Sequence, residues 1–251
     1  NLKQLGLALQ NYHLNFKRFP HNSHWREGTF KEGDREVTIT KKDFKGSMIM
    51  KLMPFLEESA ILANINTDED VMEQFAKRPD LKSTPLAVLR CPSDEYPQLG
   101  EDQQATTSYA PSVGAQKTFS FNNNSCVEPV GNEFGNGNDL APFSYLSEAT
   151  SGIFSRIVFA ASIRQILDGT SKTIAMGEVL PTCNYELIRY GWWNSQVFYV
   201  NTSPPINYDS CTATTPPWPA KQTCGTFFNY NTSAGFKSRH PGGAQFVFAD
   251  G

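Results

Sequence analysis

The chain opens with NLKQLGLALQNYHLNF, residues 1–16, in which apolar side chains recur at helical spacing. The stripe consists of Leu2, Leu5, Leu9, Tyr12 and Phe16. Steps of three and four residues place these side chains on one face of a helix, and that face must be buried against another layer. We therefore expect this helix to pack on a β-sheet, with Lys3, Gln10 and Lys17 facing water.

The rest of the chain combines short apolar runs with stretches rich in Gly, Pro and Asn. This pattern is typical of strands joined by turns and loops, and not of a helix bundle. We expect one further helical segment from Ser47 to about Asn66, interrupted at Pro54. Strands are expected at residues 37–39, 86–89, 106–113, 152–159, 172–180, 187–200 and 244–249.

Together these elements predict an α+β fold in which the N-terminal helix packs on an antiparallel sheet. We expect a single domain over residues 1–251. Residues 1–20 are expected to hold a truncated helix, because no capping residue precedes its apolar stripe. Two segments dense in Asn, Gly, Pro and aromatic residues, 115–150 and 200–230, are expected to be variable insertions with long loops.

The charge balance argues against several classes of partner. Lysine and arginine number 22 against 25 aspartate and glutamate residues, which gives a formal net charge of −3. Without a basic excess the chain has no general attraction to nucleic acid, so no such partner is expected. No apolar run of about 18 residues and no basic-then-apolar opening occurs, so neither a transmembrane helix nor a signal peptide is expected within these residues.

The cysteine pattern favours disulfides over a metal or redox motif. The five cysteines are Cys91, Cys126, Cys183, Cys211 and Cys224. No two of them form a Cys-x-x-Cys pair, and most lie in loop-like segments, so disulfides and an oxidising, extracytoplasmic location are expected. Cys211 with Cys224 is the first candidate bridge because the two flank a proline-rich turn, and Cys126 and Cys183 are the other candidates. The odd number leaves at least one thiol unpaired or paired between chains.

Several segments, taken in order, resemble one bacterial family, the prepilin-type proteins with a processing-associated H-X9-DG domain. The matching segments are NLKQLGLAL (1–9) with NYH (11–13) and FP (19–20), LMPFLE (52–57), CPSD (91–94), ILDGTSKTI (166–174) with GE (177–178), and GFKSRHPGGAQFVFADG (235–251). They run from the first residue to the last. The resemblance therefore covers the whole chain, although nothing recognisable lies at 21–45, 115–150 or 200–230.

This resemblance implies a pilin-like fold and a structural role. In the family, the helix that starts at Asn1 continues upstream into a hydrophobic anchor and assembly surface, and the chain tends to continue past Gly251. It implies a non-enzymatic subunit of a type IV pilus-like or type II secretion pseudopilus-like system at the bacterial cell envelope or surface. The implied partners are other pilin-like subunits or secretion machinery, with the membrane reached only through the missing helix.

The family signature consists of His240 with Asp250 and Gly251. An imidazole and a carboxylate form the orienting pair of many hydrolases. The strand expected at 244–249 spans roughly 20 Å at about 3.3 Å per residue, which argues against such a dyad. We expect a structural role, with His240 leading into the strand and Asp250 and Gly251 turning out of it; a binding role is the alternative.

Two other matching segments are also expected to be structural. Asp168 and Gly169 begin a segment that lacks the second glycine and the lysine of a phosphate-binding loop, so a turn is expected. Cys91, Pro92 and Asp94 offer a thiol and a carboxylate, but no Gly-x-Ser-x-Gly elbow accompanies them. We expect a turn with a buried or bridged cysteine there, and no catalytic residues.

The residue pattern predicts neither a metal site nor a cofactor. The histidines are His13, His21, His24 and His240. No two have the spacing of a His-Glu-x-x-His zinc site. Acidic residues in loops leave Ca²⁺ as an alternative, although no EF-hand run is present. These acidic residues are Asp94, Asp139, Asp168, Asp209 and Asp250.

Aromatic residues gather near the second insertion and suggest a different function. They are Tyr190, Trp192, Trp193, Tyr199, Tyr208, Trp218, Phe227, Phe228 and Tyr230. Exposed aromatic faces stack on sugars and on partner proteins. The alternative function is therefore a cell-surface module that binds a glycan or solute through Trp192, Trp193, Trp218 and Tyr208. Core packing is the simpler explanation for Trp192 and Trp193, whereas Trp218, among prolines, is the residue most expected at the surface.

Overall fold

The computed structural model describes residues 1–24, 27–32, 35–115, 151–155, 158–195, 199–212 and 224–251. Its helices are α1 (Leu2–Phe16), α2 (Met48–Leu52), α3 (Ser59–Leu62), α4 (Val71–Ala76), α5 (Pro79–Lys82), α6 (Tyr185–Arg189) and α7 (Tyr230–Ser233). Its strands are β1 (Gly28–Glu32), β2 (Arg35–Ile39), β3 (Tyr109–Pro111), β4 (Ile174–Glu178) and β5 (Phe246–Phe248). Helices combine with small antiparallel sheets, so the expected α+β class is confirmed.

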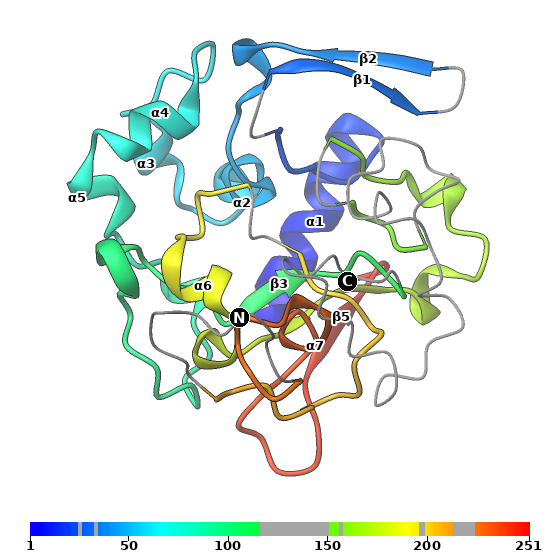
Figure 1. The fold of residues 1–251 in the computed structure, drawn as a ribbon. Coiled ribbons are helices and arrows are strands. Elements are labelled where there is room, and N and C mark those ends of the chain that lie inside the picture. The colour runs from blue at the N-terminus through cyan, green and yellow to red at the C-terminus, as the bar shows by residue number, and fades with distance from the viewer. Residues whose placement is uncertain (25–26, 33–34, 116–150, 156–157, 196–198, 213–223) are drawn as a thin grey trace.

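The central sheet has three strands in the order β3-β4-β5, all antiparallel to their neighbours. Tyr109 of β3 pairs with Glu178 of β4, and Met176 of β4 pairs with Val247 of β5. The separate β1–β2 hairpin lies away from this sheet, and α3, α4 and α5 follow one side of the molecule (Figure 1). Strand β4 thus joins two segments, β3 and β5, that lie far apart in the sequence.

Helix α1 packs on β5, as its apolar stripe predicts. Leu2, Leu5 and Leu9 are 9%, 0% and 1% exposed and belong to the main core. Gly6 lies at the contact, where a Cβ atom would stand 2.6 Å from Cγ2 of Val247. Because real Cβ atoms do not approach so closely, the glycine permits the helix to lie directly against the strand.

Two details of the α1 prediction are wrong. Phe16 is 56% exposed, because the helix ends there and Phe19, which is fully buried, fills the core instead. The Phe16 ring rests on Tyr12, with ring centroids 4.4 Å apart. Gln10 does not face water alone, since its Nε2 donates to the carbonyl of Ala249 at 2.6 Å and ties α1 to the end of β5.

Some of the other helices and strands expected from the sequence are present in the structure, and others are not. The helical segment from Ser47 is interrupted by a 3-10 turn, Met53–Phe55, which contains Pro54. Where a strand was expected at 86–89, Ala87–Leu89 form a 3-10 turn, and the segment 187–200, also expected to be a strand, begins inside α6. No helix in the described part of the chain is long and apolar enough to cross a membrane.

Candidate functional site

Three side chains from three matching segments meet at the end of the central sheet. Sγ of Cys91 lies 3.4 Å from Oε1 of Glu178 and 3.7 Å from Nε2 of His240. The same His240 nitrogen lies 3.0 Å from Oε1 of Glu178. The thiol, carboxylate and imidazole therefore face one point, and we call Cys91, Glu178 and His240 the CEH cluster.

Glu178 is held by the backbone on both sides. It is the last residue of β4, its N–H donates to the carbonyl of Gln245, and its own carbonyl accepts from the N–H of Lys237. The N–H of Gln245 donates to Oε2 at 2.8 Å, which leaves Oε1 directed at the other two members of the cluster. The Glu178 side chain is 2% exposed, so this carboxylate is buried, and the hydrogen bonds of the sheet fix its orientation.

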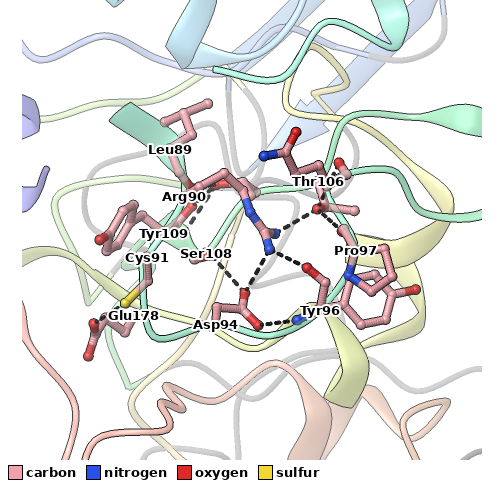
Figure 2. A network of polar contacts seen from close by, with 12 residues as sticks. Leu89, Arg90, Cys91, Asp94, Tyr96, Pro97, Thr106, Ser108, Tyr109 and Glu178 are labelled. Atoms are coloured by element: carbon pink, nitrogen blue, oxygen red, sulfur yellow. Dashed lines mark hydrogen bonds and ion pairs between the residues drawn. The ribbon is translucent and has the colours of Figure 1, made fainter. Parts of the chain in front are cut away.

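A buried ion pair positions the loop that carries Cys91. Asp94 lies 3.5 Å from the guanidinium of Arg90, and their side chains are 3% and 10% exposed. Asp94 also accepts from the hydroxyl of Ser108 at 2.7 Å, while Arg90 donates to the hydroxyl of Thr106 at 2.7 Å. Figure 2 shows this network beside Cys91 and Glu178. Charge-assisted bonds of this kind stiffen the turn and hold the thiol in place.

His240 is positioned by a loop that is held together by its own hydrogen bonds. The hydroxyl of Ser238 accepts from the N–H of His240 at 2.9 Å and donates to the carbonyl of Gly243 at 2.8 Å. Gly242 has a φ of 87°, a backbone conformation that favours glycine. The His240 side chain remains 31% exposed, so the cluster is open to solvent on the imidazole side.

A buried lysine supports the segment that leads to His240. Lys237 is 2% exposed, and its ammonium donates to the carbonyl of Thr232 at 2.9 Å near the end of α7. Burial lowers the pKa of Lys237 to about 7, and the charge of Asp209 opposes that shift. The lysine satisfies helix-end carbonyls and keeps the chain against β4.

Tyr109 completes the wall of the cluster from β3. Burial raises the pKa of the Tyr109 phenol, and the charge of Cys91 and a hydrogen bond with Cys91 raise it further. Asn1 reaches the same region, because its side-chain amide donates to the carbonyls of Ala87 and Arg90 at 3.1 and 2.5 Å. The start of α1 therefore lies beside the cysteine loop.

The CEH cluster does not have the geometry of a nucleophilic triad. In such a triad one imidazole nitrogen faces the nucleophile and the other faces the carboxylate. Here the thiol of Cys91 and the carboxylate of Glu178 both face Nε2 of His240. Three convergent donor atoms of sulfur, nitrogen and oxygen are instead the arrangement found around metal ions.

A second feature lies on the outer face of α1. Leu7 and Leu14 are 61% and 64% exposed, although both lie on the same helix as the buried stripe. Seven residues separate them, which places both on one line along the helix surface. Helix α1 is therefore apolar on its sheet side and also carries leucines that no described part of the chain covers.

The remaining signature residues lie outside the CEH cluster. Asp250 is exposed in a turn where the N–H of Gly251 donates to the carbonyl of Phe248, and it is not among the contacts of His240. Asp168 is exposed, and Gly169 has a φ of 93° in the turn before β4. Pro92 is exposed beside Cys91. The structural role assigned to these residues stays a prediction.

The expected bridge between Cys211 and Cys224 is wrong. Cys211 is bonded to Cys183, and the hydroxyl of Ser210 donates to the carbonyl of Cys183 at 3.2 Å. This disulfide links the second insertion to the turn at residues 181–183. The spacing of the cysteines along the sequence did not indicate this pairing. Cys224 is disulfide-bonded as well, Cys91 is free, and Cys126 lies outside the described residues.

The aromatic residues proposed for ligand contact are mostly unsuited to it. Trp192 and Trp193 are 0% and 5% exposed and pack around Phe75, so the core-packing explanation is confirmed for them and the alternative, ligand contact, is wrong. Each indole N–H already has an acceptor inside the protein. Tyr208 is half-buried, and Trp218 lies outside the described residues.

The acidic residues considered for Ca²⁺ do not gather. Asp94 is engaged by Arg90, and Asp168, Asp209 and Asp250 are exposed. Asp139 lies outside the described residues. In the part of the chain that the structure describes, the group of His, Cys and acidic side chains suited to a metal is the CEH cluster. Sequence reasoning missed it, although the cysteine, the Gly-Glu pair and the histidine all lie in matching segments.

Comparison with known proteins gives one match. A family profile described as a protein of unknown function, DUF1559, matches residues 1–251. No match was found among the curated proteins or among the solved structures. The match covers every segment that contributes to the CEH cluster and to α1.

Proposed function

Because the chain belongs to the DUF1559 family over its whole length, and that family is described as of unknown function, we propose a function from the molecule itself. We propose that it is a structural subunit of a type IV pilus-like or type II secretion pseudopilus-like envelope assembly. The subunit contacts its neighbours through the outer face of α1, and a hydrophobic helix preceding Asn1 anchors it in the membrane. It has no catalytic role.

The proposal rests on the presence of apolar side chains on two different sides of α1. One side is buried on β5 through Leu2, Leu5 and Leu9, whereas Leu7 and Leu14 project outward. Burying an exposed leucine stabilises by about 1.5 to 3 kcal/mol, so a line of two supplies a useful part of a helix–helix contact. Because the first residues of the chain resemble prepilin-type proteins, the partner that packs on these leucines is α1 of another copy.

The disulfide supports an extracytoplasmic location. The bond between Cys183 and Cys211 joins segments 28 residues apart, and Cys224 is also oxidised. Such bridges persist in secreted and envelope proteins and are rare in the cytosol. The glycan-binding alternative has less support, because two of its four contact residues, Trp192 and Trp193, lie in the core.

The first prediction concerns assembly. In the complete gene product, expressed in the bacterial envelope, Leu7→Glu combined with Leu14→Glu should reduce the filaments or oligomers in the sheared surface fraction by at least about tenfold. Two charges placed in an apolar helix contact remain without partners and resist burial. Negative-stain microscopy and quantitative blotting of the sheared fraction provide the measurement.

Leu167→Glu is the matched control. Leu167 is 91% exposed and belongs to the turn before β4 instead of to α1, so the same substitution there should leave assembly unchanged. The amount of cell-associated subunit must stay equal in all variants, which shows that folding and export are intact. Assembly of the double variant at the unmodified level would contradict the proposal, as would an unmodified protein that forms no oligomer.

A further inference from the structure

We propose that Cys91, Glu178 and His240 bind one divalent zinc-type metal ion, with a fourth coordination position open to solvent. This inference is independent of the assembly proposal, because it rests on the three side chains alone. In the sequence, Cys91 and Glu178 are 87 positions apart, Glu178 and His240 are 62 apart, and Cys91 and His240 are 149 apart. A coordination site assembled from such distant segments also stabilises the fold that assembles it.

The distances between the three donor atoms carry the argument. Zinc holds sulfur at about 2.3 Å and nitrogen or oxygen at about 2.0 to 2.2 Å, which separates tetrahedral ligand atoms by about 3.3 to 3.6 Å. The corresponding separations in the CEH cluster are 3.4, 3.7 and 3.0 Å. They match one face of a coordination tetrahedron to within a few tenths of an ångström.

The charge of the site points the same way. Glu178 is buried, and in the described part of the chain its ion-pair partner is the imidazole of His240, which is charged only when protonated, whereas no described lysine or arginine pairs with it. A buried carboxylate needs a compensating cation. A metal ligand set of thiolate and carboxylate carries two negative charges, which one divalent ion neutralises.

The outer contacts suit a preorganised metal site. Oε2 of Glu178 is occupied by the N–H of Gln245, so Oε1 is the atom left for the metal. The backbone of His240 is anchored through Ser238. Ligands held in this way lose little freedom on binding.

The donor set selects the metal. A thiolate disfavours Ca²⁺ and Mg²⁺, which take oxygen ligands, whereas a mixed sulfur, nitrogen and oxygen set suits Zn²⁺. Three protein ligands and a partly exposed imidazole leave a position for water or an exogenous ligand. The proposed ion is thus bound at an open site.

Zinc binding is tested on the folded chain after treatment with a chelator, using zinc chloride in equilibrium dialysis with elemental analysis. We expect one zinc per chain. Cys91→Ser and His240→Gln should each weaken zinc affinity at least tenfold. Asp250→Asn is the matched control, because Asp250 is an exposed signature residue outside the cluster. The zinc affinity of this variant should stay within about twofold of that of the unmodified protein.

A second measurement needs no substitution and so does not depend on variant folding. Cys91 is free, and zinc should slow its alkylation by iodoacetamide at least tenfold, with the effect reversed by chelator and followed by peptide mapping. Zinc binding that persists undiminished in Cys91→Ser would overturn the proposal. So would an alkylation rate of Cys91 that zinc does not change, which would leave the cluster as a hydrogen-bonded pair of Glu178 and His240.

Discussion

Asp94→Ala is expected to lower the free energy of unfolding by about 3 to 5 kcal/mol, because it leaves the buried guanidinium of Arg90 without its counter-ion. Asp94 also accepts hydrogen bonds from the hydroxyl of Ser108 and from the N–H of Tyr96, so these donors lose a partner as well. The measurement is urea-induced unfolding at neutral pH, followed by circular dichroism with the disulfides intact.

The chain provides its own control for this prediction. Arg78 and Asp80 form a second arginine–aspartate pair, at 2.7 Å, but their side chains are 43% and 60% exposed. Solvent screens such a pair, so Asp80→Ala should change stability far less. Equal effects of Asp94→Ala and Asp80→Ala would show that the network beside Cys91 is not structural.

Trp192→Ala is also expected to destabilise the protein by about 3 to 5 kcal/mol, through the cavity that it leaves in the core. The indole is fully buried, meets Phe75 edge-on at 5.6 Å between ring centroids, and donates its N–H to the carbonyl of Thr84. Truncation removes the apolar contact and leaves the part-buried carbonyl of Thr84 without its donor. Thermal unfolding of the two proteins provides the comparison.

Leu167→Ala serves as the control for this substitution. Leu167 is 91% exposed, and its truncation should change the stability by no more than about 0.5 kcal/mol. If Trp192→Ala unfolded like the unmodified protein, the indole would have to be a surface residue. The glycan-binding alternative would then return.

Local patterns predicted the parts of the fold that depend on local physics. The α1 stripe follows from the spacing of Leu2, Leu5 and Leu9, and the break at Pro54 follows from the chemistry of one residue. Phe16 was misplaced because periodicity does not show where a helix leaves its sheet. The run at residues 86–89 was misassigned because short apolar segments fit strands and turns equally well.

The candidate site depended on long-range contacts that local patterns do not encode. Cys91 and Glu178 meet because β3 and β4 pair in the register that places Tyr109 opposite Glu178. His240 joins them through the loop that precedes β5. The signature pairs His240 with Asp250, but the strand between them argued against contact, and no local pattern indicated that β4 would supply Glu178 as the carboxylate beside the imidazole. The same reason explains why Cys183, and not Cys224, is bonded to Cys211.

X-ray absorption at the zinc edge tests the central claim, metal coordination by the CEH cluster, most directly. With one equivalent of zinc bound, the account predicts a first shell with one sulfur at about 2.3 Å and nitrogen and oxygen ligands at about 2.0 to 2.2 Å. In Cys91→Ser the sulfur contribution should disappear. A shell of nitrogen and oxygen alone in the unmodified protein would contradict coordination by Cys91, and with it the proposed site.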